Sequence, residues 1–259
     1  MLLNPNDPNP IFIYNKNSLS PLILLADHGG RAIPQKLNNL GLSSNLLKLH
    51  IAYDIGIKNV GIKLAQYLDS MFIMNHYSRL VIDCNRATSS PDCISPISDN
   101  ILIPGNNNLL STEQLFRVTE IYLPYHNYIN NIINHSLQNH KVPILVSLHS
   151  FTPVMQGYQR PWHIGILWNR DKRLATLMFN LLKEDTHLCV GDNQPYSGQT
   201  CTGYTLPFHA ESLGIPHVLI ELKQDLIDHE DGVCFWAKKL FSLLKGIILN
   251  KNLHQIKKH

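Results

Sequence analysis

The sequence lacks long apolar runs, since no stretch approaches the roughly 20 consecutive apolar residues that a transmembrane helix needs. Its N-terminal segment has no basic stretch followed by an apolar one, so it does not resemble a signal peptide. Charged residues make up only 16% of the chain, and the net charge of +3 is too small to indicate a nucleic-acid partner. We therefore expect a cytoplasmic protein with no membrane span and no nucleic-acid partner.

Cysteine is also sparse. The five cysteines are scattered along the chain and form no C-x-x-C pair. An odd, scattered set argues against a disulfide framework and against a cysteine-rich zinc knuckle. We expect reduced thiols at all of these positions, which are Cys84, Cys93, Cys189, Cys201 and Cys234.

The chain has enough apolar material for a sizeable core, because 44% of its 259 residues are hydrophobic. No repeat, low-complexity linker or shift in composition marks a domain boundary. The sequence therefore predicts a single domain over residues 1–259, with a core from about 20 to 245. The C-terminal residues 245–259 mix apolar and basic side chains, which predicts a surface helix or a flexible tail.

Short apolar runs alternate with longer stretches of helical periodicity. This alternation is typical of a three-layer α/β/α sandwich with a mostly parallel sheet. The helical stretches are 46–68, 112–137, 172–182 and 233–248. The strand-like runs are 21–26, 71–74, 80–82, 144–148, 164–167 and 217–220. Functional side chains in such a sheet lie where strands end, so the polar residues that follow these runs are candidates for a site.

Four polar clusters follow the strand-like runs, and they carry His28 with a glycine pair, Asn85 with Arg86, His149, and Glu221. The Glu221 carboxylate lies between apolar residues and is costly to bury unless it is paired, hydrogen-bonded or near a metal. Two histidines, a carboxylate and an arginine are the groups that metal-assisted hydrolysis needs. The histidines hold an ion that acidifies water, the carboxylate takes the proton and the arginine holds an anionic substrate. Each residue could instead be structural, and spacing alone does not decide between the two interpretations.

Seven motifs in order resemble those of the N-formylglutamate amidohydrolase (N-formylglutamate deformylase) family, from about residue 20 to about residue 245. The motifs, which begin with ADHGGRAIP, occupy residues 26–34, 50–56, 77–86, 147–153, 160–165, 191–198 and 220–227. That family is related to zinc carboxypeptidases and aspartoacylases. The resemblance therefore implies a zinc-carboxypeptidase-like (phosphorylase/hydrolase-like) fold with a mostly parallel, mixed sheet. It also implies hydrolysis of N-formyl-L-glutamate to formate and L-glutamate.

The resemblance also implies roles for individual residues. His28 and His149 resemble the zinc-binding histidines, and Glu221 resembles the general base. Asn85 and Arg86 resemble the segment of that family that holds the substrate carboxylate. Further substrate-binding candidates are Arg79, Arg160 and Tyr196. The implied cofactor is Zn²⁺ or another divalent metal, and the implied partner is a small anionic N-acyl amino acid.

One position departs from the carboxypeptidase pattern. Carboxypeptidases place a glutamate three residues after the first histidine, and here that residue is Arg31. Two histidines alone hold a metal weakly, so a third ligand is needed. We predict Asp54, because the family carries an acid there. The alternative is Asp27, although alternation along a strand directs it away from its neighbour His28.

Two other functions stay open at this level. One is hydrolysis of another N-acyl amino acid or peptide by the same chemistry. The other is non-catalytic binding of a small acid, which Arg31 favours and the joint presence of His28, His149 and Glu221 opposes. Most of the fourteen histidines are expected to be structural or solvated, and the sequence gives no prediction of the oligomeric state.

Overall fold

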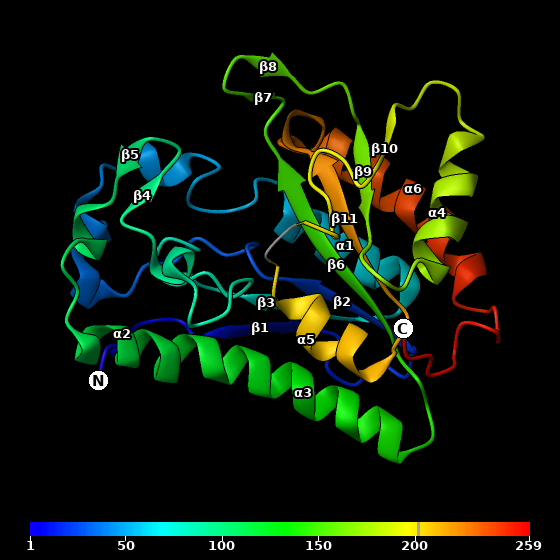
Figure 1. Cartoon of the computed structure of the whole chain (residues 1–259), viewed down its shortest axis with the longest axis horizontal. Coiled ribbons are helices and arrows are strands. Elements are labelled where there is room, and N and C mark those ends of the chain that lie inside the picture. Colours follow the sequence, from blue (N-terminus) through cyan, green and yellow to red (C-terminus); the bar gives the residue numbers. More distant parts are fainter. Residues whose placement is uncertain (201–202) are drawn as a thin grey trace.

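A seven-stranded sheet forms the centre of the computed structural model, which describes residues 1–200 and 203–259 (Figure 1). Its strands are β1 (Ile11–Tyr14), β2 (Leu22–Ala26), β3 (Met71–Asn75), β6 (Ile144–Phe151), β9 (Ile164–Leu167), β10 (Val190–Asp192) and β11 (His217–Lys223). They lie in the order β1-β3-β2-β6-β11-β9-β10. Neighbouring strands from β3 to β11 are parallel, whereas β1 runs antiparallel to β3 and β9 antiparallel to β11. The predicted mixed, mostly parallel sheet is confirmed.

Helices cover both faces of this sheet (Figure 1). One face packs against α1 (Ile57–Leu68), α4 (Arg173–Lys183) and α6 (Glu230–Ile247). The other face packs against α3 (Leu123–Gln138) and α5 (Thr205–His209). A π-helical segment, Val118–Tyr122, joins α2 (Ser111–Arg117) to α3. Apolar side chains from both faces form two core clusters, so the three-layer sandwich is also confirmed.

Shorter elements lie outside the central sheet. Two hairpins are formed by β4 (Ile97–Ser98) with β5 (Ile101–Leu102) and by β7 (Val154–Met155) with β8 (Tyr158–Gln159). Short 3-10 segments occupy Gln35–Gly41, Leu46–Lys48, Pro91–Ile94, Pro104–Asn106, Glu211–Leu213 and Gln224–Leu226. None of the helices that the structure describes is both long and apolar enough to cross a membrane.

The predicted strand over 80–82 is wrong, because these residues form a turn and a buried loop. Their side chains are buried in the same core cluster as those of α3. Two side chains from elsewhere in the chain donate hydrogen bonds to the carbonyls of this loop. Asn106 Nδ2 donates to the Leu80 carbonyl at 2.8 Å, and Arg117 Nη1 donates to the Val81 carbonyl at 2.8 Å. A loop whose carbonyls are bound in this way can be as apolar as a buried strand without pairing to one.

Arg117 is fully buried, and its guanidinium donates to the carbonyls of Val81 and Gly105 and to Oδ1 of Asn106. An Arg117→Met variant keeps an apolar stem but leaves three acceptors without their donor. We expect the free energy of unfolding to fall by about 3 kcal/mol. Urea denaturation measures this loss, and an exposed Lys172→Met variant, expected to change stability by less than about 0.5 kcal/mol, is the control. Equal losses in the two variants would contradict the structural role of Arg117.

The predicted helix over 46–68 is present only in its second half, as α1. Gly56 precedes α1 with a φ of 81°, a conformation that favours glycine. A Cβ atom there would lie 2.2 Å from the carbonyl oxygen of Ile227, so the turn also needs the missing side chain. The loop before it is held by the Asp54 amide, which donates to the His28 carbonyl at 2.8 Å. This loop, and not a helix, therefore carries Asp54 to the end of β2.

The other predicted helices are present, and part of the C-terminal tail packs on the domain. The helices over 112–137, 172–182 and 233–248 are confirmed as α2 to α3, α4 and α6. After α6, Leu253 is buried and the Lys257 amide donates to the Gly214 carbonyl at 2.9 Å, so part of this tail packs on the domain. The free cysteines are Cys84, Cys93, Cys189 and Cys234, and the predicted thiol of Cys201 lies outside the described residues.

Candidate metal centre and active site

His149 and Glu221 lie side by side within the sheet. β6 continues to Phe151 and β11 continues to Lys223, so both residues are inside strands and not after them. The parallel register pairs His149 with Glu221. Side chains alternate along a strand, and Leu145 and Leu219 belong to the core beneath α3 and α5. His149 and Glu221 therefore point to that same face.

His28 and Asp54 approach His149 from two loops, one after β2 and one before α1. Asp54 Oδ2 lies 3.0 Å from Nδ1 of His149 and 3.7 Å from Nδ1 of His28. All three side chains are buried. In the described part of the chain, these three residues form the group whose possible ligand atoms all lie within 4.8 Å of one another.

A carboxylate lies at the far nitrogen of each histidine ring. His28 Nε2 is 2.7 Å from Asp83 Oδ1. His149 Nε2 is 3.1 Å from Ser147 Oγ and 3.4 Å from Asp27 Oδ2. A carboxylate partner fixes one ring nitrogen as a hydrogen-bond donor and leaves the other free to bind a metal. Both Nδ1 atoms are therefore directed to the centre of the group.

The donor set fits a divalent metal of the zinc type. Nδ1 of His28 is buried and has no hydrogen-bond partner. Zinc bonds of about 2.0–2.1 Å in a tetrahedron place ligand atoms about 3.4 Å apart. The distances from Asp54 Oδ2 to the two histidines, 3.0 and 3.7 Å, lie on either side of that value. Asp27 contacts His149 from the opposite side of its ring, away from this group.

The carboxyl groups of the site have different proton affinities. Burial raises the pKa of Asp54, but the charge of His28 and hydrogen bonds with His149 and His28 outweigh it and hold that pKa below its ordinary value. Burial instead raises the pKa of Glu221 to about 7, and Oε2 of Glu221 is buried without a hydrogen-bond partner. Asp54 is therefore held in the ionised form that a metal ligand needs, and Glu221 is able to exchange protons near neutral pH.

The chain is similar to known proteins over most of its length. A family model described as N-formylglutamate amidohydrolase matches residues 20–228. The chain belongs to the N-formylglutamate amidohydrolase family. A solved gene product of Agrobacterium tumefaciens is 33% identical, with a TM-score of 0.91 over 97% of this chain and 99% of that chain. The N-formylglutamate amidohydrolase of Ralstonia eutropha JMP134 shares the fold at 16% identity, with a TM-score of 0.69 over 93% of this chain and 98% of that chain. No curated protein matches the sequence.

In this member of the N-formylglutamate amidohydrolase family, two arginines lie around the centre. Arg79 Nη1 is 3.7 Å from Asp54 Oδ1. Arg160 is buried, donates to the Tyr196 hydroxyl at 3.1 Å, and has its guanidinium carbon 5.7 Å from the ring centroid of Phe151 at the end of β6. Arg79 thus contacts the group of His28, Asp54 and His149, whereas Arg160 and its partner Tyr196 lie at the end of β6, and the role of all three in binding stays a prediction.

The other two predicted substrate-binding residues make local hydrogen bonds. Asn85 Oδ1 accepts from the amides of Tyr204 at 2.9 Å and Thr205 at 3.0 Å, which fixes the start of α5. Arg86 Nη1 donates to the Asn85 carbonyl at 3.2 Å. A contact of Arg86 with substrate would use its remaining donors, since a guanidinium carries five N–H groups.

Sequence reasoning misses Asp83 and Ser147, the residues that support the two histidines. Burial raises the pKa of Asp83, but the charges of His28 and Arg79 outweigh this effect and hold it below the ordinary value. The signal that could have found Asp83 is the one that finds Glu221, an acid directly after an apolar run. Ser147 gives no comparable signal, because a serine within a strand does not indicate its partner.

A second pair of buried histidines joins α3 and α5 beside the segment of Asp83. His126 Nδ1 is 2.9 Å from His209 Nε2, and His126 Nε2 is 2.9 Å from the Cys84 carbonyl oxygen. A carbonyl only accepts, so Nε2 of His126 donates to it, and Nδ1 of the neutral ring accepts from His209. The pair thus acts as a structural connection that requires a neutral His126 ring, and burial disfavours a charge on either ring.

This pair makes stability depend on pH. Burial lowers the pKa of His126 to about 4 and that of His209 to about 3. Unfolded histidines titrate near about 6.5, so the unfolded state binds more protons below that pH, and stability falls as the pH falls. Relative to a His126→Gln/His209→Gln variant, we expect a loss of up to about 1.4 kcal/mol per pH unit for each histidine between about pH 6.5 and 4. Urea denaturation at several pH values measures this loss. A free energy of unfolding that fell in parallel with pH in the wild type and in the double variant would contradict the prediction.

Proposed function

We propose that this chain is a metal-dependent amidohydrolase that converts N-formyl-L-glutamate and water to formate and L-glutamate. The observation that carries this proposal is the buried group of His28, Asp54 and His149 beside Glu221, in a chain of this family. These three residues would hold Zn²⁺ or another divalent ion. The ion, when bound, polarises the amide carbonyl and lowers the pKa of water.

Glu221 is the proposed general base. It accepts a proton from the attacking water and later delivers that proton to the nitrogen of the leaving amine as the C–N bond breaks. Its unpartnered Oε2 atom supports this role, because no other group of the described chain occupies its lone pairs. Its pKa of about 7 suits a group that must both take up and release a proton at neutral pH.

Arg160 is the proposed main contact for a substrate carboxylate, supported by Arg79 and Tyr196 and by the predicted pair Asn85 and Arg86. The buried guanidinium of Arg160 donates to oxygen atoms of Thr152 and to Tyr196. These acceptors are neutral, and a planar guanidinium binds a carboxylate through two parallel hydrogen bonds. An anionic substrate would therefore supply the negative charge that the present partners of Arg160 lack.

Replacing Arg160 tests that contact. An Arg160→Met variant keeps most of the side-chain volume and removes the charge, so we expect kcat/KM for N-formyl-L-glutamate to fall about 100-fold, mostly through KM. Lys238→Met, which removes the charge of an exposed side chain on α6 at the opposite face of the sheet, is the control. Equal kinetics of the two variants would remove Arg160 from the substrate site.

One experiment tests the proposed function as a whole. The purified protein is analysed for bound metal, and formate release from N-formyl-L-glutamate is measured with and without a chelator. We expect about one divalent ion per chain and release that stops on chelation and returns with added Zn²⁺. Bound metal without release would contradict the substrate. Absence of metal binding under all conditions would contradict the mechanism and favour non-catalytic binding of a small acid.

A further inference from the structure

A network of buried hydrogen bonds extends from His149 away from the metal group. Nε2 of His149 lies 3.1 Å from Ser147 Oγ, which in turn lies 3.5 Å from Asp27 Oδ2. The other oxygen of Asp27, Oδ1, accepts from the Thr205 hydroxyl at 2.6 Å. All four side chains are buried, and Thr205 is fully buried. This set, the Asp27 network, therefore connects a proposed metal ligand to the first residue of α5.

One arrangement of hydrogens satisfies the whole Asp27 network. When Nδ1 of His149 binds the metal, Nε2 of the neutral ring carries the hydrogen and donates it. A carboxylate only accepts, so the hydroxyls of Ser147 and Thr205 both donate to Asp27. Thr205 has a second acceptor, the Cys84 carbonyl, but it is further away at 3.4 Å. Each hydrogen bond of the network therefore supports the ring orientation that directs Nδ1 to the metal group.

Within residues 1–200 and 203–259, Asp27 has His149 as its one ion-pair partner and no lysine or arginine. The acid that supports the other histidine, Asp83, instead accepts from Arg79 Nη2 at 2.9 Å. A carboxylate removed from water is stable only where hydrogen bonds or charges replace its hydration. The Thr205 contact, at 2.6 Å, has the length of a charge-assisted hydrogen bond. It is therefore a main stabilising contact of Asp27.

Other parts of the protein fix the position of Thr205. Asn85 Oδ1 accepts from the amides of Tyr204 and Thr205, so it holds the start of α5. At the end of α5, Nε2 of His209 is 2.9 Å from Nδ1 of His126 on α3. The helix is thus held at both ends by contacts that do not involve the carboxylate. Thr205 is therefore a rigid donor that orients this carboxylate.

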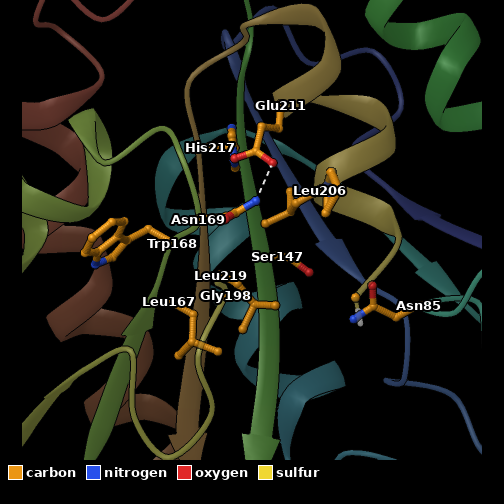
Figure 2. Close-up of a pocket in the computed structure, with 12 residues that line it drawn as sticks. Asn85, Ser147, Leu167, Trp168, Asn169, Gly198, Leu206, Glu211, His217 and Leu219 are labelled. Carbon is orange, nitrogen blue, oxygen red and sulfur yellow. Dashed lines mark hydrogen bonds and ion pairs between the residues drawn. The ribbon is translucent and has the colours of Figure 1, made fainter. Parts of the chain in front are cut away.

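The start of α5 also lies beside the strand that carries His149. Ser147 of β6, Asn85 and Leu206 of α5 line one small pocket (Figure 2). Leu206 follows Thr205 directly in the sequence. Thr205 therefore lies where the α5 segment meets the residues that support the metal group.

We propose that Thr205 is a positioning residue for the metal centre. Its hydroxyl holds Asp27, and Asp27 and Ser147 together hold the His149 ring so that Nδ1 faces the metal. This inference rests on the proposed amidohydrolase function. Among the hydrogen bonds of the described residues, Thr205 makes none with the three proposed ligands or with Glu221. It should therefore affect metal affinity and the reaction step and leave substrate binding unchanged.

A Thr205→Val variant tests the proposal, because it removes the hydroxyl, keeps the shape of the side chain and keeps the amide that Asn85 holds. We expect the affinity for Zn²⁺, measured by competition with a chelating dye, to fall about tenfold, at the lower end of the range for outer-shell partners. With Zn²⁺ saturating, kcat for N-formyl-L-glutamate should also fall about tenfold, and KM should change by less than about twofold. Thr205→Ser keeps the hydroxyl and should restore affinity and kcat to within about twofold of the wild type.

A second variant tests the Asp27 network from its other end. Ser147→Ala removes the hydroxyl between His149 and Asp27, so the affinity for Zn²⁺ should again fall about tenfold. This measurement decides the proposal even if Thr205→Val does not fold. An unchanged affinity in Ser147→Ala would show that the network does not position His149.

A control variant separates positioning from stability. Ser70 is fully buried, and its hydroxyl donates to the Leu68 carbonyl at 3.3 Å. It lies directly before β3, at the opposite end of the sheet from His28, which follows the parallel strand β2. Ser70→Ala should lower stability in urea denaturation to a similar extent as Thr205→Val, because each removes a buried hydroxyl. Its affinity for Zn²⁺ and its kcat should equal those of the wild type.

The remaining outcomes are distinguishable. Unchanged Zn²⁺ affinity and kcat in Thr205→Val would overturn the proposal, and so would a Thr205→Ser variant as defective as Thr205→Val. A raised KM with unchanged Zn²⁺ affinity would mean that Thr205 acts through Asn85 on the substrate, and the proposal would be wrong. Metal affinity does not need turnover. A wild type that binds Zn²⁺ and releases no formate would thus contradict the proposed function, while the affinities of the Thr205 variants would still decide this inference.

Discussion

A Glu221→Gln variant is expected to lose about 10³-fold in kcat while it keeps its metal. Glutamine has the size of glutamate but cannot accept a proton at neutral pH, so the attacking water loses its base. The contacts that orient His28 and His149 come from other residues, namely Asp83, Ser147 and Asp27, and they do not involve Glu221. The metal site should therefore survive this change.

Formate release under single-turnover conditions measures the loss, and metal content measured on the same sample shows whether the site is intact. Glu184→Gln makes the same change at an exposed acid directly after α4, so it is the matched control and should leave kcat unchanged. Full turnover by Glu221→Gln would show that another group is the base. Loss of metal from this variant would instead place Glu221 among the ligands.

The interior of the fold could be predicted from the sequence because its strands are short apolar runs between helical stretches. β2 and β9 have the predicted position to within one residue. The strands β1 and β10 lie at the two edges of the sheet, where β1 is only half-buried and β10 has three residues. Edge strands bury less of their surface, so their sequences carry a weaker apolar signal.

Local pattern could not distinguish the loop at 80–82 from a strand. Its apolar residues are buried as a strand would be, and only the distant donors Asn106 and Arg117 replace the ladder hydrogen bonds. The same limit applies to Asp54. Helical periodicity extends over 46–68, but the helix begins only after Gly56, whose close approach to Ile227 fixes the turn there, and no local feature of the sequence shows that contact.

The candidate site was predictable to the extent that it consists of acids and histidines next to apolar runs. His28, His149 and Glu221 carry that signal, and the structure brings them to one face of the sheet. The supporting carboxylates could not be assigned, because the distinction between a ligand and its supporting acid depends on which ring nitrogen each one contacts. That geometry separates Asp54, near both Nδ1 atoms, from Asp83 and Asp27, near the Nε2 atoms.

Metal affinity should therefore separate Asp54 from the other two acids. An Asp54→Ala variant removes a ligand atom, and we expect its affinity for Zn²⁺ to fall by more than the roughly 10–100-fold that removal of an outer-shell partner causes. Asp83→Asn and Asp27→Asn keep the side-chain size and should fall within that range, because each leaves the ligand set complete and only loosens one ring. Competition with a chelating dye measures all three affinities under the same conditions.

The comparison also decides between the two candidates for the third ligand. Asp27 contacts Nε2 of His149 and accepts from the Thr205 hydroxyl at 2.6 Å, so both of its oxygens are directed away from the centre. If Asp27→Asn nevertheless lost more affinity than Asp54→Ala, the two acids would have to exchange roles. His149 would then bind the metal through Nε2, and the unpartnered Nδ1 of His28 would no longer face it. An Asp54→Ala variant with unchanged affinity would leave only two histidines, a set too small for a catalytic zinc site.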